Sequence, residues 1–163
     1  MIFFKHILLG GETLRSVLIR LMFFCLCFCV VLRSFYGFRI IIGSSMDPTF
    51  SDREIFITRN FNPDKSPVKR FDVVIFPDPS DSESTLVKRI IALPNESIEI
   101  KKGYIYLNEK KLEDLVGDTY VGQKLDKDKI IVPEGCLWVI GDNRDDSWYG
   151  IIERKKIKGK VIW

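Results

Sequence analysis

Histidine is almost absent from this sequence. The 163 residues contain a single histidine, His6, close to the N-terminus. The body of the chain therefore cannot hold a Ser-His-Asp triad, which needs an imidazole as its general base. A metal site built from several histidines is excluded for the same reason. Any serine nucleophile in this chain must rely on another kind of base.

Cysteine is scarce too, and its positions do not reveal the cellular compartment. Cys25, Cys27 and Cys29 lie inside an apolar stretch, where cysteine behaves as a small apolar residue, and Cys136 has no evident disulfide partner. No Cys-x-x-Cys pair occurs, so the sequence gives little support to a zinc site or a thiol-redox site.

Strong net charge is also lacking. The net charge of +3 is too small to indicate a nucleic acid partner, and we expect none. Hydrophobic residues make up 46% of the chain and charged residues 29%, which is typical of a globular protein. The length fits one modest domain together with a membrane anchor.

A long apolar run near the N-terminus predicts that anchor. Leu21 to Leu32 carries no charge, and a lipid-spanning helix needs roughly 20 mostly apolar residues. Extending the run at both ends gives a transmembrane signal-anchor helix over residues 14–36, with Arg20 reaching toward the nearer headgroups. A cleaved secretion signal is the main alternative, but residues 31–35 offer no small-x-small cleavage site.

The charges that flank the apolar run predict its orientation. Lys5, Arg15 and Arg20 precede the apolar core, and Arg33 and Arg39 follow it. This small excess favours an N-terminus in the cytoplasm. We therefore expect residues 1–13 in the cytoplasm, one pass through the cell membrane, and a domain over residues 37–163 outside the cytoplasm.

Beyond the anchor the sequence reads as short strands separated by turns, and no long stretch has helical periodicity. The predicted strands lie at residues 54–58, 71–76, 86–93, 98–100, 104–107, 130–132 and 137–140, and residues 104–112 are expected to form a hairpin. Turn signals such as Pro77-Asp78-Pro79 and Pro94-Asn95 separate them. The pattern predicts a mainly β fold, an antiparallel barrel or sandwich, with residues 98–135 forming a small β-hairpin or insert region.

Lys88 is the best candidate for the missing base. A lysine accepts a proton only when it is neutral, and its ordinary pKa is about 10.4. Burial among apolar side chains disfavours the ammonium and lowers this pKa. On a strand, Lys88 shares a face with Leu86 and Ile90, whereas Arg89 points to the other face. The alternative is a lysine at a strand edge that reaches solvent.

Ser44 and Ser45 are both candidates for the nucleophile. They lie in the polar segment Gly43–Thr49, shortly after the anchor. Pro48 favours a turn here, because the residue before a proline is pushed out of the helical region. Such a turn exposes a hydroxyl and directs backbone N–H groups at an oxyanion, although a Ser-Ser pair in a turn is commonly only a turn. The residues alone do not decide between the two serines.

Four blocks of this sequence resemble the sequence boxes of type I signal peptidases. Gly43–Thr49 (GSSMDPT) resembles the serine box, in which the nucleophile directly precedes Met. Arg70–Val74 is similar to the (R)GDVV strand, with Phe71 in place of glycine. Leu86–Pro94 (LVKRIIALP) resembles the lysine box, and Gly141–Ser147 (GDNRDDS) resembles the GDNRDNS box. The blocks occur in the family's order and span residues 43 to 147.

The resemblance implies a membrane-bound serine endopeptidase with a Ser/Lys dyad and no metal or cofactor. Ser45 would attack the scissile carbonyl, and its backbone N–H would donate to the oxyanion. Lys88 would accept the hydroxyl proton and later protonate the leaving amine, while Ser147 would hydrogen-bond Lys88 and hold it. Asp142 and Arg144 would brace the site. Residues 37–163 would be the peptidase domain.

The substrates that the resemblance implies are exported preproteins with small residues at −1 and −3, whose signal peptides the enzyme removes. The extended substrate would add as a strand to the edge of the sheet. The residues expected to bind it are Ile41, Ile42, Gly43, Met46, Leu86 and Val87. The expected partners are these preproteins and membrane lipid, with the secretion translocon nearby.

Two features bear on contact with lipid outside the anchor. The basic segment Glu153–Lys160 is either a solvated strand edge or a site of attraction to anionic headgroups. Phe35, Tyr36, Phe38 and Phe50 lie near the anchor and suit an interfacial aromatic belt.

The chain departs from the family's pattern in three places. Many members carry a serine two residues before the nucleophile, where this chain has Gly43, so backbone donors remain for the oxyanion. After Ser147, the segment Trp148-Tyr149-Gly150 stands in place of x-Asp-Ser-Arg. Ala92 and Asn95 replace glycines that are common in the lysine box.

Two other functions fit parts of the sequence. A self-cleaving Ser/Lys peptidase of the repressor type resembles the expected fold, but the anchor and the GDNRDDS block argue against it. A catalytically impaired, membrane-anchored β-domain acting as a binding or partner module is the second. The presence of both Ser45 and Lys88 argues against that one.

Overall fold

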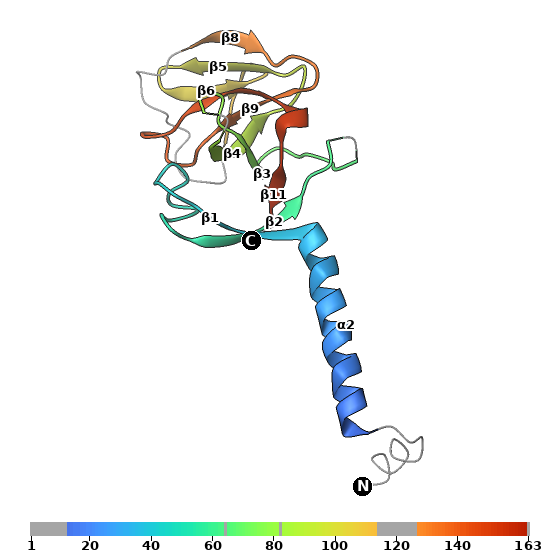
Figure 1. Cartoon of the computed structure of the whole chain (residues 1–163). Coiled ribbons are helices and arrows are strands. Elements are labelled where there is room, and N and C mark those ends of the chain that lie inside the picture. The colour runs from blue at the N-terminus through green and yellow to red at the C-terminus, as the bar shows by residue number, and fades with distance from the viewer. Residues whose placement is uncertain (1–12, 64, 82, 114–126, 163) are drawn as a thin grey trace. The chain divides into compact units, whose positions relative to one another are not determined.

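A computed structural model describes residues 13–63, 65–81, 83–113 and 127–162 (Figure 1). The chain divides into two compact units, residues 1–36 and residues 37–163. The expected cytoplasmic segment 1–13 lies outside the described residues except for Thr13. Within the expected insert region 98–135, residues 114–126 lie outside them as well.

The described part of the first unit is the helix α2, Leu14–Phe35. Its start is capped by the Thr13 hydroxyl, which accepts a hydrogen bond from the Ser16 N–H and so satisfies one otherwise free amide. The 22 residues of α2 have a mean hydropathy that reaches 2.2. They extend about 33 Å at 1.5 Å per residue, against a bilayer core of about 30 Å. The helix is therefore long and apolar enough to cross a membrane.

The second unit is built mainly on a seven-stranded sheet, counted over the described residues, in the order β1-β2-β11-β3-β4-β9-β10. The strands are β1 Tyr36–Ile40, β2 Ile55–Asn60, β3 Val73–Pro77, β4 Thr85–Ala92, β9 Cys136–Ile140, β10 Tyr149–Glu153 and β11 Gly159–Val161. In this order, each pair of neighbouring strands from β2 to β10 is antiparallel. β11 pairs with β2 on one side and with β3 on the other, although these strands are far apart in the sequence.

A second sheet of the described residues has the order β7-β6-β5-β8. Its strands are β5 Ser97–Lys101, β6 Tyr104–Leu107, β7 Lys110–Lys111 and β8 Lys127–Ile131, and a short 3-10 helix, η3 Arg154–Lys156, separates β10 from β11. Ile98 and Ile105 of this sheet pack with Ile91, Trp138 and Ile140 of the first sheet. The second sheet therefore buries the ends of β4 and β9.

Strands β3 and β4 separate two further apolar clusters, because neighbouring residues on a strand point to opposite faces. On one side, Ile75 and Val87 pack with Met46. On the other side, Phe76 and Leu86 pack with side chains of β9 and β10. We call these two sides of the sheet the Met46 face and the Phe76 face.

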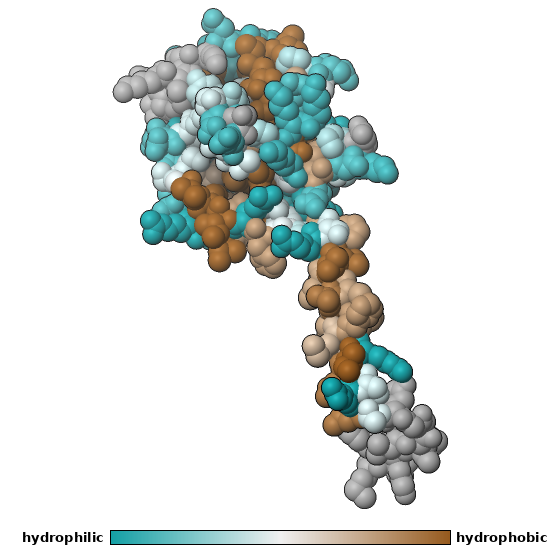
Figure 2. Space-filling view, viewed as in Figure 1, coloured by the Kyte–Doolittle hydropathy of each residue, from teal (hydrophilic) through white to brown (hydrophobic). Residues whose placement is uncertain are grey.

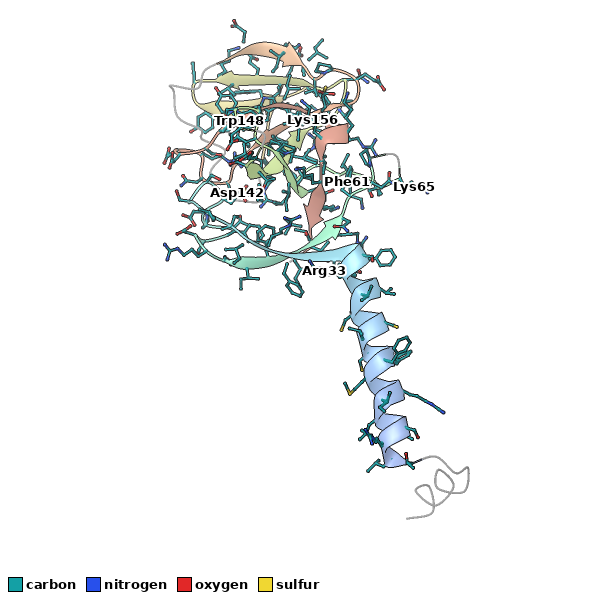
Figure 3. The ribbon with its side chains drawn as sticks, viewed as in Figure 1. Arg33, Phe61, Lys65, Asp142, Trp148 and Lys156 are labelled. Atoms are coloured by element: carbon teal, nitrogen blue, oxygen red, sulfur yellow. The ribbon has the colours of Figure 1, made fainter. Side chains whose placement is uncertain are left out.

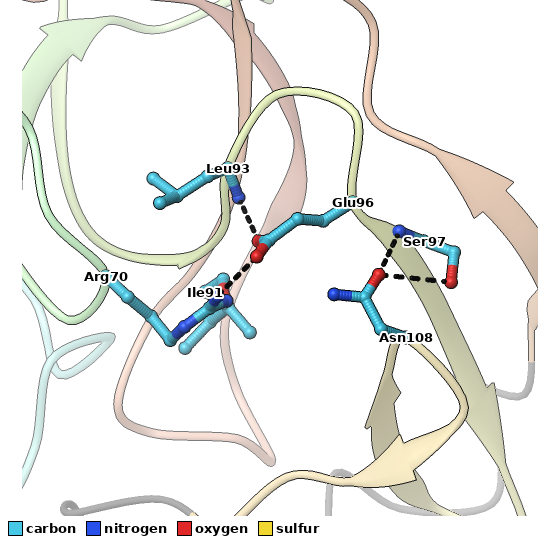
Figure 4. Close-up of polar contacts among 6 residues, drawn as sticks. All are labelled: Arg70, Ile91, Leu93, Glu96, Ser97 and Asn108. Carbon is cyan, nitrogen blue, oxygen red and sulfur yellow. Dashed lines mark hydrogen bonds and ion pairs between the residues drawn. The ribbon is translucent and has the colours of Figure 1, made fainter.

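An ion pair fixes the turn that links β4 to β5 (Figure 4). One oxygen of the Glu96 carboxylate lies 2.5 Å from Arg70 Nη2, and the other accepts the Leu93 N–H at 2.7 Å. Arg70 also donates to the Ile91 carbonyl. These contacts hold the C-terminal end of β4 against the segment that leads into β3.

The expected mainly antiparallel β architecture with one N-terminal apolar helix is confirmed, but the two sheets are not closed into a barrel. Each strand predicted from the sequence occurs; β6 has the predicted bounds, and the ends of the others are shifted. The sequence pattern does not predict β1, β10 or β11. Each of these short strands contains a glycine, Gly37, Gly150 or Gly159, and glycine is unfavourable in strands.

Candidate active site

Ser45 lies in a tight turn after β1. The Asp47 N–H donates to the Ser44 carbonyl at 3.0 Å, and the Phe50 N–H donates to the Met46 carbonyl at 3.0 Å. Met46 is fully buried and Phe50 is 3% exposed, whereas Ser45 is half-buried. The apolar side chains therefore anchor the turn from below, and the serine remains partly accessible.

Strand β4 brings Lys88 to Ser45. Lys88 is paired with Val74 of β3 and lies between Leu86 and Ile90 on the Phe76 face, as the sequence pattern predicts. Its side chain is 2% exposed. Lys88 Nζ donates a hydrogen bond to Ser45 Oγ at 2.6 Å, although the two residues are 43 positions apart in the chain. Of the two candidate serines, Ser45 is therefore the one whose hydroxyl contacts the lysine.

Burial lowers the pKa of Lys88 from 10.5 to about 8. The negative charges of Asp142, Asp78 and Asp146 act in the opposite sense and limit this decrease in pKa. At pH 7, about one Lys88 side chain in ten is then neutral, compared with roughly three in ten thousand for an ordinary lysine. The site thus supplies a usable amine base near neutral pH.

Asn143 holds the serine turn from the other side. Its backbone N–H donates to the Ser45 carbonyl at 3.2 Å. Its side-chain Nδ2 donates to the Ser44 carbonyl at 3.1 Å, across 99 positions of sequence. Both carbonyls of the Ser-Ser pair are therefore bound by one residue of the 141–147 block.

Gly141 allows this block to approach the turn. A Cβ at position 141 would lie 2.1 Å from the Ser45 carbonyl oxygen and 2.0 Å from Ser147 Oγ. Both distances are far below van der Waals contact, so a side chain at position 141 would force the block away from Ser45.

Ser147 binds the block's own backbone. Its Oγ accepts the Gly141 N–H at 2.9 Å and donates to the Trp148 carbonyl at 3.1 Å. A serine hydroxyl has one proton to donate, and here the Trp148 carbonyl takes it. The expected hydrogen bond between Ser147 and Lys88 is not among the contacts of the described residues, and Ser147 holds Gly141 instead.

Arg89 and Asp142 form a buried ion pair next to the dyad. Arg89 Nε lies 2.7 Å from Asp142 Oδ1 and Arg89 Nη2 lies 2.5 Å from Oδ2, with the two residues 8% and 5% exposed. Arg89 also donates to the Phe71 carbonyl at 2.8 Å and to Thr49 Oγ1 at 3.3 Å. The pair therefore links the serine turn, the segment just before β3 and the 141–147 block. Arg144, in the same block, is also buried.

Sequence patterns do not reveal Arg89, Gly141 or Asn143 as parts of the site. A strand arginine beside a lysine looks like a solvent-facing charge until its carboxylate partner is known. The signal that was available is the GDNRDDS block itself, in which the first three residues all contact the serine turn or Arg89.

The six residues expected to bind substrate lie in different environments. Ile41 and Met46 are buried, Leu86 and Val87 are half-buried, and Ile42 and Gly43 are exposed. Strand β9 pairs with β4 from Arg89 to Ala92. In the described part of the chain, Leu86 and Val87 therefore lie beyond the end of this pairing, on a side where β4 is open.

The backbone near Ser45 also offers a free donor. The Gly43 N–H is already used, since it donates to Asp52 Oδ1 at 2.8 Å. The Ser45 N–H donates to no group among the described residues.

The described residues include no group of three or more His, Cys, Asp or Glu side chains that could hold a metal ion.

The family profile, the relatives and the solved structure that match this chain are all signal peptidases. The profile of the family described as signal peptidase, peptidase S26, matches residues 14–163. Signal peptidase I of Bacillus caldolyticus is 31% identical over 158 residues, which cover 85% of each chain. Signal peptidase I of Bacillus licheniformis is 34% identical over 74% of this chain and 71% of its own. A solved signal peptidase I from Enterococcus faecalis V583 covers 60% of this chain and 98% of its own, with 24% identity and a TM-score of 0.46.

The chain therefore belongs to the signal peptidase family, peptidase S26. It is a serine endopeptidase that removes signal peptides from preproteins, and the resemblance seen in the four sequence blocks is confirmed. Nothing in these comparisons supports the alternative of a catalytically impaired binding module.

Proposed function

We propose that Ser45 and Lys88 form the catalytic dyad of this endopeptidase. The observation that carries the proposal is the 2.6 Å hydrogen bond between Lys88 Nζ and Ser45 Oγ. When Lys88 is neutral, it accepts the hydroxyl proton as Ser45 Oγ attacks the scissile carbonyl. The resulting ammonium protonates the leaving amine, and an acyl-enzyme remains on Ser45.

The same two residues complete the cycle. Lys88, neutral again, takes a proton from a water molecule that attacks the acyl ester, and it returns that proton to Ser45 Oγ as the new carboxyl terminus leaves. In both halves the carbonyl oxygen carries negative charge. The free Ser45 N–H is the donor proposed for this oxyanion, because Gly43 brings no hydroxyl.

Ser147, Asp142 and Arg144 are proposed to support the dyad rather than to touch the substrate. Ser147 acts through Gly141, and Asp142 acts through Arg89 and Thr49. Arg144, which is buried in the same block, is proposed to brace the site. Asn143 joins this group because it binds both carbonyls of the Ser-Ser pair.

The substrate is proposed to bind as an added strand beside Leu86 and Val87, where β4 is open. Its side chains then alternate between the two faces of the sheet. The small residues at −1 and −3 lie on the Met46 face, where Val87 packs near Met46 and Ile41. Ile42 and Gly43 border the scissile bond, and the residue at −2 points to the Phe76 face.

Membrane lipid is the second proposed partner. Four residues of the strands β1 and β2 and the segment after β1 are apolar and highly exposed: Phe38, Ile40, Ile42 and Ile55. Figure 2 shows hydrophobic side chains at the surface of the second unit. Exposed apolar patches of this kind mark contact surfaces. We call these four residues the β1–β2 patch.

The proposed location follows from α2 and its flanking charges. The helix spans the cell membrane once, its N-terminus lies in the cytoplasm, and the second unit lies outside the cytoplasm. Preproteins emerging from the secretion translocon would reach the enzyme there.

The dyad is tested by cleavage of a preprotein with purified full-length enzyme. Ser45→Ala and Lys88→Met should each lower kcat/KM by at least about a thousandfold, since members of a catalytic unit fail together. Ser44→Ala is the matched control and should retain most of the activity, because only the carbonyl of Ser44 is used. Full activity of Ser45→Ala, or loss of activity in Ser44→Ala alone, would show that the nucleophile is misassigned.

A further inference from the structure

We propose that Trp148 forms the wall of the subsite for substrate residue −2 and selects an apolar side chain there. This inference rests on the dyad and the substrate strand proposed above. Trp148 belongs to the short segment after Ser147 in which this chain departs from the family's pattern. The wall is therefore a feature of this chain's own sequence.

The indole of Trp148 reaches across the Phe76 face. Its ring centroid lies 6.0 Å from that of Phe76 on β3. The ring also rests on Gly150 of β10, where a Cβ would lie 2.9 Å from the ring atom Cζ2. In the sheet order, β4 and β9 lie between β3 and β10. The ring therefore contacts residues of the two strands, β3 and β10, that flank β4 and β9 in this sheet.

The part of β4 that it approaches carries the dyad. Leu86 is directly opposite Phe76, and Lys88 is the next residue of β4 on the same face. The backbone of Trp148 is tied to the site as well, because Ser147 Oγ donates to the Trp148 carbonyl and accepts the Gly141 N–H. Figure 3 labels Trp148 and Asp142 in the same part of the unit.

The indole keeps a free apolar surface in this position. Trp148 is 40% exposed even though it packs against Phe76 and Gly150. A substrate strand beside Val87 points its −2 side chain to this face, because −1 and −3 occupy the other one. An apolar −2 side chain would bury part of the indole on binding, whereas a small polar side chain would leave it in water.

The test uses full-length enzyme and two preproteins that differ only at −2, with Phe in one and Ser in the other. Wild type should cleave the Phe substrate with a kcat/KM about tenfold higher, the order that an added apolar contact provides. Trp148→Ala should reduce this ratio to about twofold or less. Equal cleavage of both substrates by wild type, or an unchanged ratio in Trp148→Ala, would overturn the proposal.

Ile151→Ala is the matched control. Ile151 is also 40% exposed and lies on β10, but its side chain points away from the face on which its neighbour Ile152 packs. This variant should keep the wild-type ratio. Loss of the ratio in both variants would mean that damage to β10, and not the indole wall, changes selectivity.

A second measurement does not depend on the folding of Trp148→Ala. A peptide with benzoyl-phenylalanine at −2 is photocrosslinked to the Ser45→Ala enzyme, and the attachment site is mapped by mass spectrometry. We expect attachment at Trp148 or Leu86, and attachment at Met46 or Val87 would contradict the proposal. If Ser45→Ala still cleaved preprotein, the dyad would be wrong; if only the −2 results failed, the dyad would stand and the wall alone would be wrong.

Discussion

The buried amine of Lys88 makes activity depend on pH in a defined direction. Its pKa is lowered to about 8, and only the neutral amine can take the Ser45 proton. We expect kcat/KM to rise with pH and to level off above about 8, as measured with a preprotein that stays soluble across the range. Asp146→Asn removes a negative charge that raises the pKa of Lys88, so its profile should move to lower pH. A profile that is flat between pH 6 and about 9 would rule out Lys88 as the base.

Single residues of the site differ in how far the sequence reveals them. Lys88 is predictable because alternation on a strand places it between Leu86 and Ile90, and burial follows from those neighbours. Gly141 and Asn143 are not, because their roles depend on an approach of two segments that no local pattern records. Ser147 falls between these cases: its block is recognisable, but the partners of its hydroxyl are not.

Two positions where this chain replaces a glycine of the family pattern adopt glycine-like backbone. Phe71 has φ 69° and Asn95 has φ 67°. Asparagine tolerates the left-handed region, whereas a bulky residue there is uncommon and strained by an amount of order 1–3 kcal/mol. Packing of the Phe71 ring against the cluster between the two sheets offsets this strain. The Phe71 carbonyl also accepts a hydrogen bond from Arg89, so this strained residue helps to hold the Arg89 side chain at the site.

Strand β4 is the element on which the site depends most. It presents Lys88 to one face and Arg89 to the other, in consecutive positions. A slip of one residue in its register would exchange the two side chains between faces. Pairing with β3 and β9 and the ion pair at its C-terminal turn hold that register.

The Arg70–Glu96 pair at this turn should contribute measurably to stability. Burial alone would raise the pKa of Glu96, but the hydrogen bonds from Arg70 and the Leu93 N–H and the charge of Arg70 outweigh it, so the pKa is lowered. Glu96→Gln should lower the free energy of unfolding at pH 7 by about 1–2 kcal/mol, less than the roughly 1.5–3 kcal/mol of a charged hydrogen bond because the pair is partly exposed. Chemical denaturation of the detergent-solubilised enzyme measures this difference.

The pH dependence of the same variant gives a second check. A carboxylate with a lowered pKa stabilises the fold above its ordinary pKa of 4.5, and this stability is lost as pH falls through the lowered value. The difference between Glu96→Gln and wild type should therefore shrink in acid. Glu109→Gln breaks an exposed pair with Lys129 and should leave stability unchanged. Equal effects of the two substitutions would count against a special role for the turn.

Strands could be predicted from the sequence where apolar and polar residues alternate or where β-branched residues form a run. Ile98-Glu99-Ile100 and Phe71–Phe76 are such runs, and β5 and β3 occur there. β1, β10 and β11 depend on neighbours for their pairing and contain glycine, so local propensity gives no signal. The missing strands include both outer strands of the large sheet, which is why its extent could not be read from the sequence.

The assembled protein should touch lipid through the β1–β2 patch as well as through α2. A tryptophan introduced at Ile55 and one introduced at Ile131 start from equal exposure, 65% and 67%, but only Ile55 belongs to the patch. In nanodiscs that contain brominated lipid, the Ile55→Trp enzyme should lose clearly more tryptophan fluorescence than the Ile131→Trp enzyme. Equal quenching of the two variants would show that this patch does not contact lipid.

The position of β11 links catalytic competence to the progress of translation. Ser45 precedes β2 and Lys88 lies on β4, yet the strand that joins β2 to β3 comes from residues 159–161. A growing polypeptide therefore contains both dyad residues long before the sheet between them can be completed. A ribosome-bound or prematurely ended chain lacks the strand that couples its two halves, so we expect such a chain to be inactive until residues 159–161 are free to pair.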